Sequence, residues 1–447
     1  MGDRKFFGTL GAALAFWPAL ASAQQIVEPF LPVPALAPVE PQAIPATSEP
    51  PRGTTVLSRP RPETDPQGTR LGSFFLFPRL ELDEAYNDNI FATPNNTSSD
   101  FITTVAPSFD LLSNWNQDAL NLHAGGAFGM YASHSSENYK DGFVSGDGRL
   151  DISEGQQAYG GLQASHQHES RYSPNSPGSA AEPVKYNTYG GNLGYAQSGL
   201  RIGYSADFSL NRYEYEAPPA VGGGFVPQSD RNYTTPDLAL RASYEFAENI
   251  AAYIRGEGNY RAYDHGASAT SPSRTSAGYR IDTGLHADLT GVSVADVYVG
   301  YLTQLYQSSA YNTNRGIDFG AKVTWNPTTL DTVRFGIDRT VQDSSNAALG
   351  PGQVSSGYLE TVVGATLDHE LLRNLILSGN ASYTNDSFSG INRTDNVYAV
   401  GTGARYLMNR YLYLGFSYSY SHRESGGAQA ITPYSDNVFM LRLSTQL

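Results

Sequence analysis

The segment LRIGYSADFSLN, residues 200–211, alternates between apolar and polar side chains along most of its length. One face would carry the apolar set Leu200, Ile202, Tyr204, Ala206, Phe208 and Leu210. The opposite face would carry Arg201, Ser205, Asp207, Ser209 and Asn211. Because successive side chains of a β-strand point to opposite sides, this pattern predicts a strand with one apolar and one polar face. Similar stretches recur from about residue 74 to the end of the chain.

The breaks between these stretches alternate in length. Short turns include Asn116-Gln117, Ser198-Gly199, Ala247-Glu248 and Pro327-Thr328. Long polar breaks include residues 170–183, 216–231, 264–274 and 343–355. Outer-membrane β-barrels have short periplasmic turns and longer extracellular loops. We therefore predict an all-β fold, a transmembrane antiparallel β-barrel of about eighteen strands over residues 73–447, with sixteen or twenty strands as alternatives. Both termini would then be periplasmic.

The N-terminal residues predict export from the cytoplasm. Arg4 and Lys5 precede an apolar run from Phe6 to Leu20, and Ala21-Ser22-Ala23 offers the small residues of a cleavage site. We expect residues 1–23 to be a signal peptide, because the apolar run is too short for a membrane-spanning helix. Residues 24–72 are rich in proline, which helices and central strands exclude, and they predict a disordered periplasmic arm.

Composition narrows the class of protein further. The chain has no cysteine, so it has neither a disulfide framework nor a thiolate metal site. A net charge of -14 argues against nucleic acid as a partner. The aromatic content is 12%, with 30 tyrosines, a residue type suited to membrane interfaces. The apolar face of the last stretch, which ends at Leu447, resembles the C-terminal signal read by the barrel assembly machinery. We therefore expect outer-membrane lipid and that machinery as partners.

The charged faces of the predicted strands should line the lumen. An Arg or Lys facing lipid at mid-depth costs about 2–4 kcal/mol, whereas the lumen is wet. Polar groups there could hydrogen-bond a hydroxylated solute, and Tyr rings could stack on sugars. The alternative is that charges of both signs pair along the wall and stiffen it. The predicted solute path consists of Arg201, Asp207, Tyr253, Arg255, Glu257, Arg261, Arg280, Asp282, Asp318, Lys322, Arg334 and Asp338.

One short segment carries a family resemblance. The segment LELDEAYNDNIFA, residues 80–92, resembles the opening strand of the putative beta-barrel porin 2 family, and the matching residues are Tyr86, Asp88, Asn89, Ile90 and Phe91. Members are outer-membrane barrels frequently encoded beside capsule and exopolysaccharide genes. The resemblance implies polysaccharide export or a related porin role, and it identifies no catalytic residue. Without the resemblance, Asp88-Asn89 is equally a turn that caps a strand.

An enzyme is the least supported alternative. His166 and His168 lie two residues apart with Glu169 beside them, so they could bind a metal or serve catalysis. Such a group is also an ordinary solvated strand end. No GxSxG, HExxH, phosphate-binding or dinucleotide-binding motif occurs in a fitting context. We therefore expect no catalysis, no metal site and no cofactor.

These observations give a ranked set of functional hypotheses. The first is a channel that exports a polysaccharide, either exopolysaccharide or capsule, together with a periplasmic export partner and without chemistry. The second is a general or substrate-selective diffusion porin. The third is a rim-based enzyme or adhesin. The identity of the solute, the resting state of the pore and the oligomeric state stay open at this point.

Overall fold

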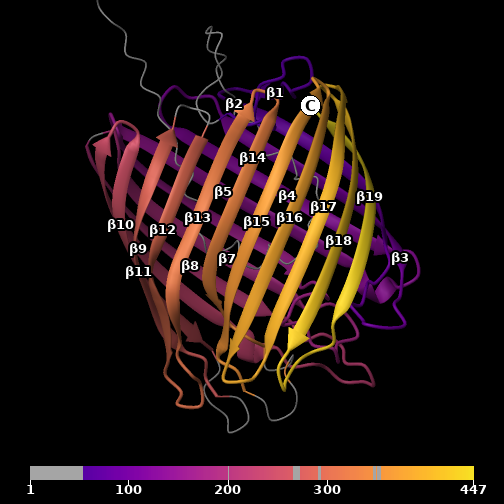
Figure 1. Cartoon of the computed structure of the whole chain (residues 1–447). Coiled ribbons are helices and arrows are strands. Elements are labelled where there is room, and N and C mark those ends of the chain that lie inside the picture. Colours follow the sequence, from indigo (N-terminus) through magenta and orange to yellow (C-terminus); the bar gives the residue numbers. More distant parts are fainter. Residues whose placement is uncertain (1–53, 200, 265–271, 290–292, 346–348, 350–353) are drawn as a thin grey trace, which may run out of the picture.

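The computed structural model describes residues 54–447 except 200, 265–271, 290–292, 346–348 and 350–353. The predicted signal peptide and residues 24–53 of the predicted arm lie outside the described residues. The described chain forms one antiparallel sheet of 19 strands, in which β2 to β19 pair in sequence order and β19 pairs back to β2 (Figure 1). The short β1 pairs only with β2. The closed ring of β2 to β19 confirms the predicted all-β barrel and its strand number.

The ring is regular, and helical structure within the described residues is limited to two short 3-10 turns, η1 (Ser135–Glu137) and η2 (Ser229–Arg231). The strands are β1 (Thr69–Leu71), β2 (Phe74–Asn87), β3 (Asp100–Ser113), β4 (Ala119–Tyr131), β5 (Tyr139–Ser153), β6 (Gln156–His168), β7 (Lys185–Gln197), β8 (Ile202–Tyr215), β9 (Tyr233–Ala247), β10 (Ile250–Tyr263), β11 (Ser276–Leu289), β12 (Ser293–Tyr306), β13 (Asn314–Thr328), β14 (Asp331–Gln342), β15 (Gly357–Leu372), β16 (Leu375–Ser389), β17 (Thr394–Asn409), β18 (Leu412–Gly426) and β19 (Tyr434–Gln446).

The two ends of the barrel differ in their connections. At one end, which we call the short-turn end, consecutive strands are joined by connections such as residues 154–155, 248–249 and 373–374. At the other, the long-loop end, the connections include residues 169–184, 216–232 and 343–356. The C-terminus lies at the short-turn end (Figure 1). The short and the long connections therefore lie at opposite ends of the barrel, as their alternation along the sequence predicted.

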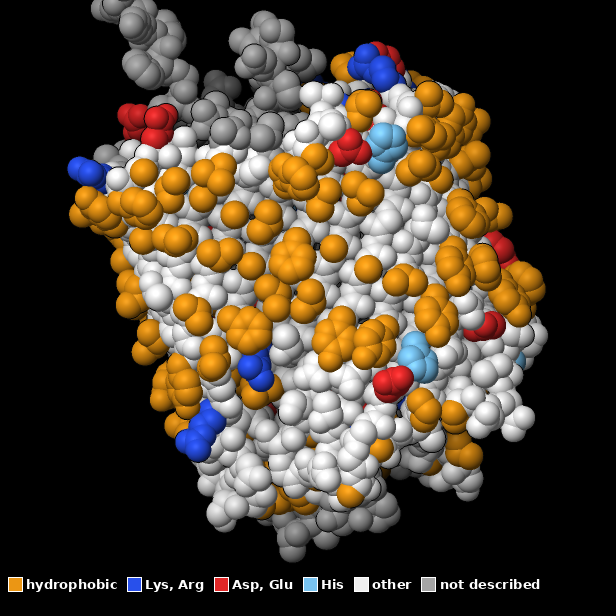
Figure 2. Space-filling model, viewed as in Figure 1, with side chains coloured by type: hydrophobic (Ala, Val, Ile, Leu, Met, Phe, Trp, Pro, Cys, Tyr) orange, Lys and Arg blue, Asp and Glu red, His pale blue; other side chains and the backbone are white. Residues whose placement is uncertain are grey.

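The two faces of the wall follow the predicted alternation. On β8, Phe208 and Leu210 are 44% and 46% exposed and point outward, whereas Ser209 and Asn211 are 7% and 8% exposed and point inward. Hydrophobic side chains are spread over the outer wall (Figure 2). An outward apolar face and an inward polar face suit a barrel surrounded by lipid. Among the described residues, no helix has the length and apolar character needed to cross a membrane.

One seam of the wall is only partly paired. Between β13 and β14, the register runs from Thr328 and Asp331 as far as Ala321 and Ile337 and then stops. Residues 338–342 of β14 still pair with residues 358–362 of β15. This part of β14 is bound by arginine side chains from strands further along the ring instead of by β13. Arg280 of β11 donates to the Arg339 carbonyl at 3.1 Å, and Arg261 of β10 donates to the Val341 carbonyl at 3.0 Å.

We call residues 338–345 and 357–362 the lumenal flap. A Cβ atom on Gly316 of β13 would lie 3.5 Å from Leu359 Cδ1, so the flap passes close behind β13. Leu302, an apolar residue on the inward face of β12 opposite Gly316, is only 4% exposed. The flap is therefore turned into the lumen at the long-loop end.

Residues 54–65, which we call the strap, differ from the predicted disordered arm. Val56 is 1% exposed and packs against Ile376, Leu407 and Tyr413 on the inward face at the short-turn end. Arg61 donates to Glu370 at 2.7 Å. The strap is ordered because an apolar side chain covers an apolar patch of the lumen wall, and burying that surface is favourable. The proline content of this region did not reveal that patch.

We expect Val56→Asp to release the strap, because a carboxylate buried without a partner is strongly unfavourable. Cleavage after Glu63 by the glutamate-specific protease Glu-C in the purified barrel should then become at least about tenfold faster, since a loss of about 1.4 kcal/mol changes the open population by that factor. Val221→Asp, in an exposed loop, is the matched control and should leave cleavage unchanged. Equal cleavage rates in all three proteins would show that Val56 does not hold the strap.

Candidate functional site: a narrowed lumen

A long connection crosses the barrel at its long-loop end. It comprises residues 169–184, between β6 and β7, and we call it the lumenal loop. Near its start, the Tyr172 hydroxyl donates to the Asn89 carbonyl at 2.9 Å, beyond the end of β2. Further along, Asn175 Nδ2 donates to the Asp343 carbonyl of the lumenal flap at 3.0 Å, and Ser345 N donates back to Asn175 Oδ1 at 2.8 Å. The loop thus connects β2 to β14, which are far apart around the ring.

Buried ion pairs hold the lumenal loop in place. Arg231 of η2 donates to both carboxylate oxygens of Glu169, at 2.8 and 3.0 Å, and its guanidinium lies 3.9 Å from the centre of the Tyr215 ring. Burial would lower the pKa of the Arg231 guanidinium, but the Glu169 carboxylate raises it, and the net shift is upward. The Arg231 guanidinium therefore stays charged. A second pair links Arg171 to Glu137 of η1 at 2.7 Å.

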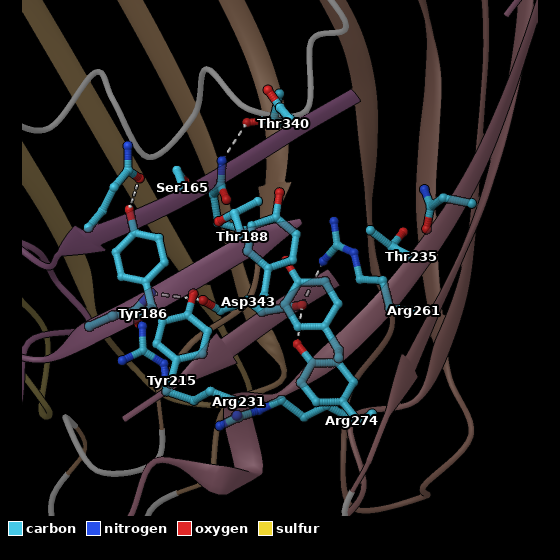
Figure 3. A pocket seen from close by; sticks show the side chains of 18 of the residues that line it. Ser165, Tyr186, Thr188, Tyr215, Arg231, Thr235, Arg261, Arg274, Thr340 and Asp343 are labelled. Atoms are coloured by element: carbon cyan, nitrogen blue, oxygen red, sulfur yellow. Dashed lines mark hydrogen bonds and ion pairs between the residues drawn. The ribbon is translucent and has the colours of Figure 1, made fainter. Parts of the chain in front are cut away.

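The lumenal flap is fixed by a second polar cluster. Arg261 of β10 forms an ion pair with Asp343 at 2.7 Å, and the Tyr306 hydroxyl donates to the same carboxylate at 3.2 Å. The Tyr263 hydroxyl also donates to it. Figure 3 shows Arg261 and Asp343 facing one another across the site. The lumenal loop and the flap therefore meet at Asp343 and narrow the lumen together.

A cavity of about 400 Å³ remains beside this junction. Stacked tyrosines form part of its wall, because the ring centres of Tyr213 and Tyr233 lie 4.7 Å apart and those of Tyr233 and Tyr263 lie 4.9 Å apart. Hydroxyl and amide side chains from β6, β7, β9 and β14 complete the lining (Figure 3). The cavity is thus polar, aromatic and part of the lumen. We call it the tyrosine pocket.

The register places most of the predicted solute path on the inward face. The inward residues are Asp207, Tyr253, Arg255, Glu257, Arg261, Arg280, Asp282, Asp318, Lys322, Arg334 and Asp338. Arg201 is the exception, because β8 begins at Ile202 and Arg201 lies in the preceding turn at the short-turn end. It is exposed, and its guanidinium lies 5.4 Å from the ring centre of Tyr244, which points outward. Whether the inward set contacts a solute stays a prediction.

Most of these charges are paired along the wall. Arg255 lies 2.9 Å from Asp282 and Arg280 lies 2.9 Å from Asp318. The contacts that complete this network are Arg280–Glu257 at 3.8 Å, Arg334–Asp368 at 2.7 Å, Tyr253–Asp296 at 2.7 Å and Tyr298–Asp338 at 2.7 Å. Arg261, by contrast, reaches across to the lumenal flap. The alternative, in which charges pair within the wall, therefore describes most of the set. Arg261 instead belongs to the constriction, by which we mean the narrowing of the lumen by the lumenal loop and the flap.

The residues of the family-like motif close the barrel. Asn437 of β19 donates its backbone N–H and its side-chain amide to Asp88, each at 2.7 Å. Asn89 is fully buried and donates to the Ser435 carbonyl at 2.8 Å. Ile90 is 3% exposed, Phe91 packs edge-on against His134, and Tyr86 packs against Phe101. The segment is thus a turn at the end of β2 that joins the first strand of the ring to the last. It is also the segment that Tyr172 of the lumenal loop contacts.

Below this turn, Arg442 of β19 pairs with Asp83 at 2.7 Å and Glu81 at 3.3 Å across the same seam. We expect Arg442→Ala to lower the free energy of unfolding by about 3–5 kcal/mol, because two buried carboxylates would lose their counter-ion. Arg315→Ala, at an exposed position, should change it by less than about 0.5 kcal/mol. Guanidinium-induced unfolding followed by tryptophan fluorescence measures both. If Arg442→Ala lowered the free energy of unfolding by less than about 1 kcal/mol, Arg442 would have no role in joining β19 to β2.

The residues of the predicted enzyme alternative are not brought together. His166 Nδ1 lies 2.8 Å from Asn187 Oδ1, and His168 Nδ1 lies 2.9 Å from Asp141. Glu169 is bound by Arg231 instead. Nowhere in the described part of the chain do three or more His, Cys, Asp or Glu side chains form a group that could hold a metal ion. The site predicted for a rim-based enzyme at these residues is therefore not formed.

The loop residues that build the constriction were missed in the sequence. Tyr172, Asn175, Arg231, Arg274 and Asp343 all lie in long breaks, where strand alternation gives no information. A usable signal was present in composition, since residues 169–172 place Glu, Arg and Tyr, and residues 228–231 place Asp and Arg, at the ends of two long loops. Charged residues that flank a loop are candidates for anchoring it inward.

No curated protein matches the chain. Solved structures of Pseudomonas aeruginosa proteins align with it at low identity. OccK2 (OpdF) aligns at 11% identity and a TM-score of 0.45, covering 84% of this chain and 99% of that chain. OpdO aligns at 12% identity and a TM-score of 0.44, covering 84% and 98%. OpdQ aligns at 12% identity and a TM-score of 0.44, covering 84% and 97%.

A protein family matches nearly the whole described chain. The family described as Putative beta-barrel porin 2 matches residues 61–447, which include the strap from Arg61 onward, every strand and every long loop. The match agrees with the closed antiparallel ring and its outward apolar face. The chain therefore belongs to the Putative beta-barrel porin 2 family, a family of outer-membrane β-barrels.

Proposed function

We propose that the protein is a selective diffusion channel for small polar solutes, with its long-loop end outside the cell and both termini in the periplasm. The observation that carries this proposal is the contact between Asn175 of the lumenal loop and Asp343 of the flap. An eighteen-stranded barrel is wide enough to hold an aqueous channel, so segments folded into it set the size limit. The outer-membrane lipid and the barrel assembly machinery are the partners that this function requires.

Polysaccharide export is the second candidate. A polymer must pass the constriction as a continuous chain, yet buried ion pairs hold the lumenal loop across that path. Export would therefore require displacement of the loop, by a periplasmic export partner or by the polymer itself. The implied link to exopolysaccharide genes favours this candidate, whereas the packing of the loop favours diffusion of small solutes.

Planar lipid bilayers test the channel proposal. We expect the purified, refolded protein to produce discrete steps of ionic current, each smaller than an unobstructed barrel of this strand number would give. Absence of steps from protein that migrates as a folded barrel on unheated gels would refute a channel. Gene deletion tests the second candidate, because loss of polymer outside the cell with accumulation in the periplasm would favour export over diffusion.

A further inference from the structure

The tyrosine pocket contains a buried guanidinium whose donors are only partly used. Arg274, between β10 and β11, is 2% exposed and lines the pocket (Figure 3). Its Nη1 atom lies 3.6 Å from Asp230 Oδ2. Within the described residues, its Nε and Nη2 atoms have no hydrogen-bond partner. A buried donor without a partner is costly, so a bound molecule that accepts hydrogen bonds there would be stabilised.

The other two arginines of the pocket differ from Arg274. Arg231 is held by both oxygens of Glu169, and Arg261 is held by Asp343 at 2.7 Å and by the Val341 carbonyl at 3.0 Å. Their donors already face protein acceptors. Among the arginines that line the pocket, Arg274 is therefore the one that keeps guanidinium nitrogens without an acceptor in the described part of the chain.

The charge of the pocket indicates a neutral ligand. Each of the three arginines has one carboxylate within ion-pair range, namely Glu169, Asp343 and Asp230. The three positive charges are thus matched by three negative charges, and no net field favours an anion. The remaining polar lining offers hydroxyl and amide groups, which both donate and accept hydrogen bonds; it includes Gln163, Ser165, Thr188, Thr235, Asn259 and Gln342.

An aromatic ring supplies the apolar part of the pocket. Phe143 points inward from β5 and is 47% exposed. Its ring lies over Gly125 of β4, where an added Cβ would come within 2.7 Å of the ring. The glycine lets the ring lie along the wall and keeps it accessible from the lumen. A flat aromatic surface beside hydroxyl and amide groups suits a molecule with one apolar and one hydroxylated face.

We propose that the tyrosine pocket binds a neutral, polyhydroxylated solute of roughly mono- to disaccharide size, with Arg274 donating to its hydroxyl oxygens and Phe143 contacting its apolar face. This inference rests on the proposed diffusion channel and names the class of solute that the constriction selects. The cavity of about 400 Å³ limits the bound portion to a small solute.

Isothermal titration of the detergent-purified full chain with maltose tests the proposal. We expect binding that weakens at least tenfold in Arg274→Gln and severalfold in Phe143→Ala. Arg373→Gln, at an exposed turn of the short-turn end, should bind as wild type. We expect glucuronate to bind no more tightly than glucose, because the pocket carries no net positive charge.

Three results would each overturn the proposal: no maltose binding, unchanged maltose affinity in both pocket variants, or tighter binding of glucuronate than of glucose. Phe143→Ala keeps the test decisive if Arg274→Gln does not fold, because Phe143 is half exposed and contributes little to packing. The titration does not depend on ion flow. Channel currents without maltose binding would therefore refute the solute class alone, and maltose binding without currents would refute the channel alone.

Discussion

Replacing residues 171–181 of the lumenal loop with a short Gly-Ser linker is expected to raise the single-channel conductance about threefold or more. The replacement removes Tyr172 and Asn175, which connect the loop to the turn after β2 and to the flap. The ring itself does not depend on these residues, since strand pairing is continuous through β6, β7 and β8. The barrel should therefore stay folded while its lumen widens.

Planar-bilayer recordings at fixed salt concentration measure this effect. Deletion of Asn95 and Asn96 is the matched control, because these residues are exposed in the loop between β2 and β3. The loop of residues 216–232 is unsuitable, because the Val221 N–H donates to the Ser179 carbonyl of the lumenal loop. Deletion of Asn95 and Asn96 should leave the conductance within the spread of the wild type. Equal conductance in the loop replacement and the wild type would mean that the lumenal loop is not the narrowest part of the path.

The second large effect concerns the lumenal flap. The chain has no cysteine, so an introduced pair is the only source of thiols. In the structure, Gly316 lies close to Leu359, and the pair Gly316→Cys with Leu359→Cys should therefore cross-link with a short bifunctional thiol reagent in most molecules. If β14 instead paired with β13 along its whole length, the observed register would continue and place Gly316 opposite Gln342.

The pair Gly316→Cys with Gln342→Cys is thus the matched alternative. This pair should cross-link in a small minority of molecules. In those molecules the cross-link would hold β14 against β13, and the conductance should rise, because Asp343 would leave Arg261 and Tyr306. Gel mobility after tryptic cleavage between β13 and β15 gives the yield of each cross-link. A higher yield for the pair with Gln342 would show that the seam is closed and that the flap does not narrow the lumen.

Alternation and break length were sufficient to predict the ring. Residues 200–211 show why, because outward Phe208 and Leu210 and inward Ser209 and Asn211 follow directly from the period of a strand. The same rule placed Arg255, Arg280 and Asp318 in the lumen. It failed at Arg201, one residue before β8, because alternation has meaning only within a strand.

The constriction could not be predicted, because it depends on contacts between segments far apart in the sequence. Asn175 meets Asp343 only through the closure of the whole ring. The contact of Val56 with Tyr413 at the short-turn end was hidden from the sequence for the same reason. The flap could not be predicted either. Its residues alternate like those of any strand, and nothing in the local sequence marks the point where β14 stops pairing with β13. The motif at Asp88-Asn89 was found as a resemblance, and its contact with Tyr172 became visible only in the structure.

The most direct test of the central claim is swelling of proteoliposomes in neutral solutes of increasing size. The claim is that a wide barrel is narrowed by the lumenal loop and the flap to a path for small polar solutes. We predict rapid swelling in glucose, slower swelling in maltose, and no swelling in dextran oligomers too large for the constriction, with the limit moving upward after loop replacement. Equal swelling rates from glucose to dextran, or no swelling in any solute, would contradict the account.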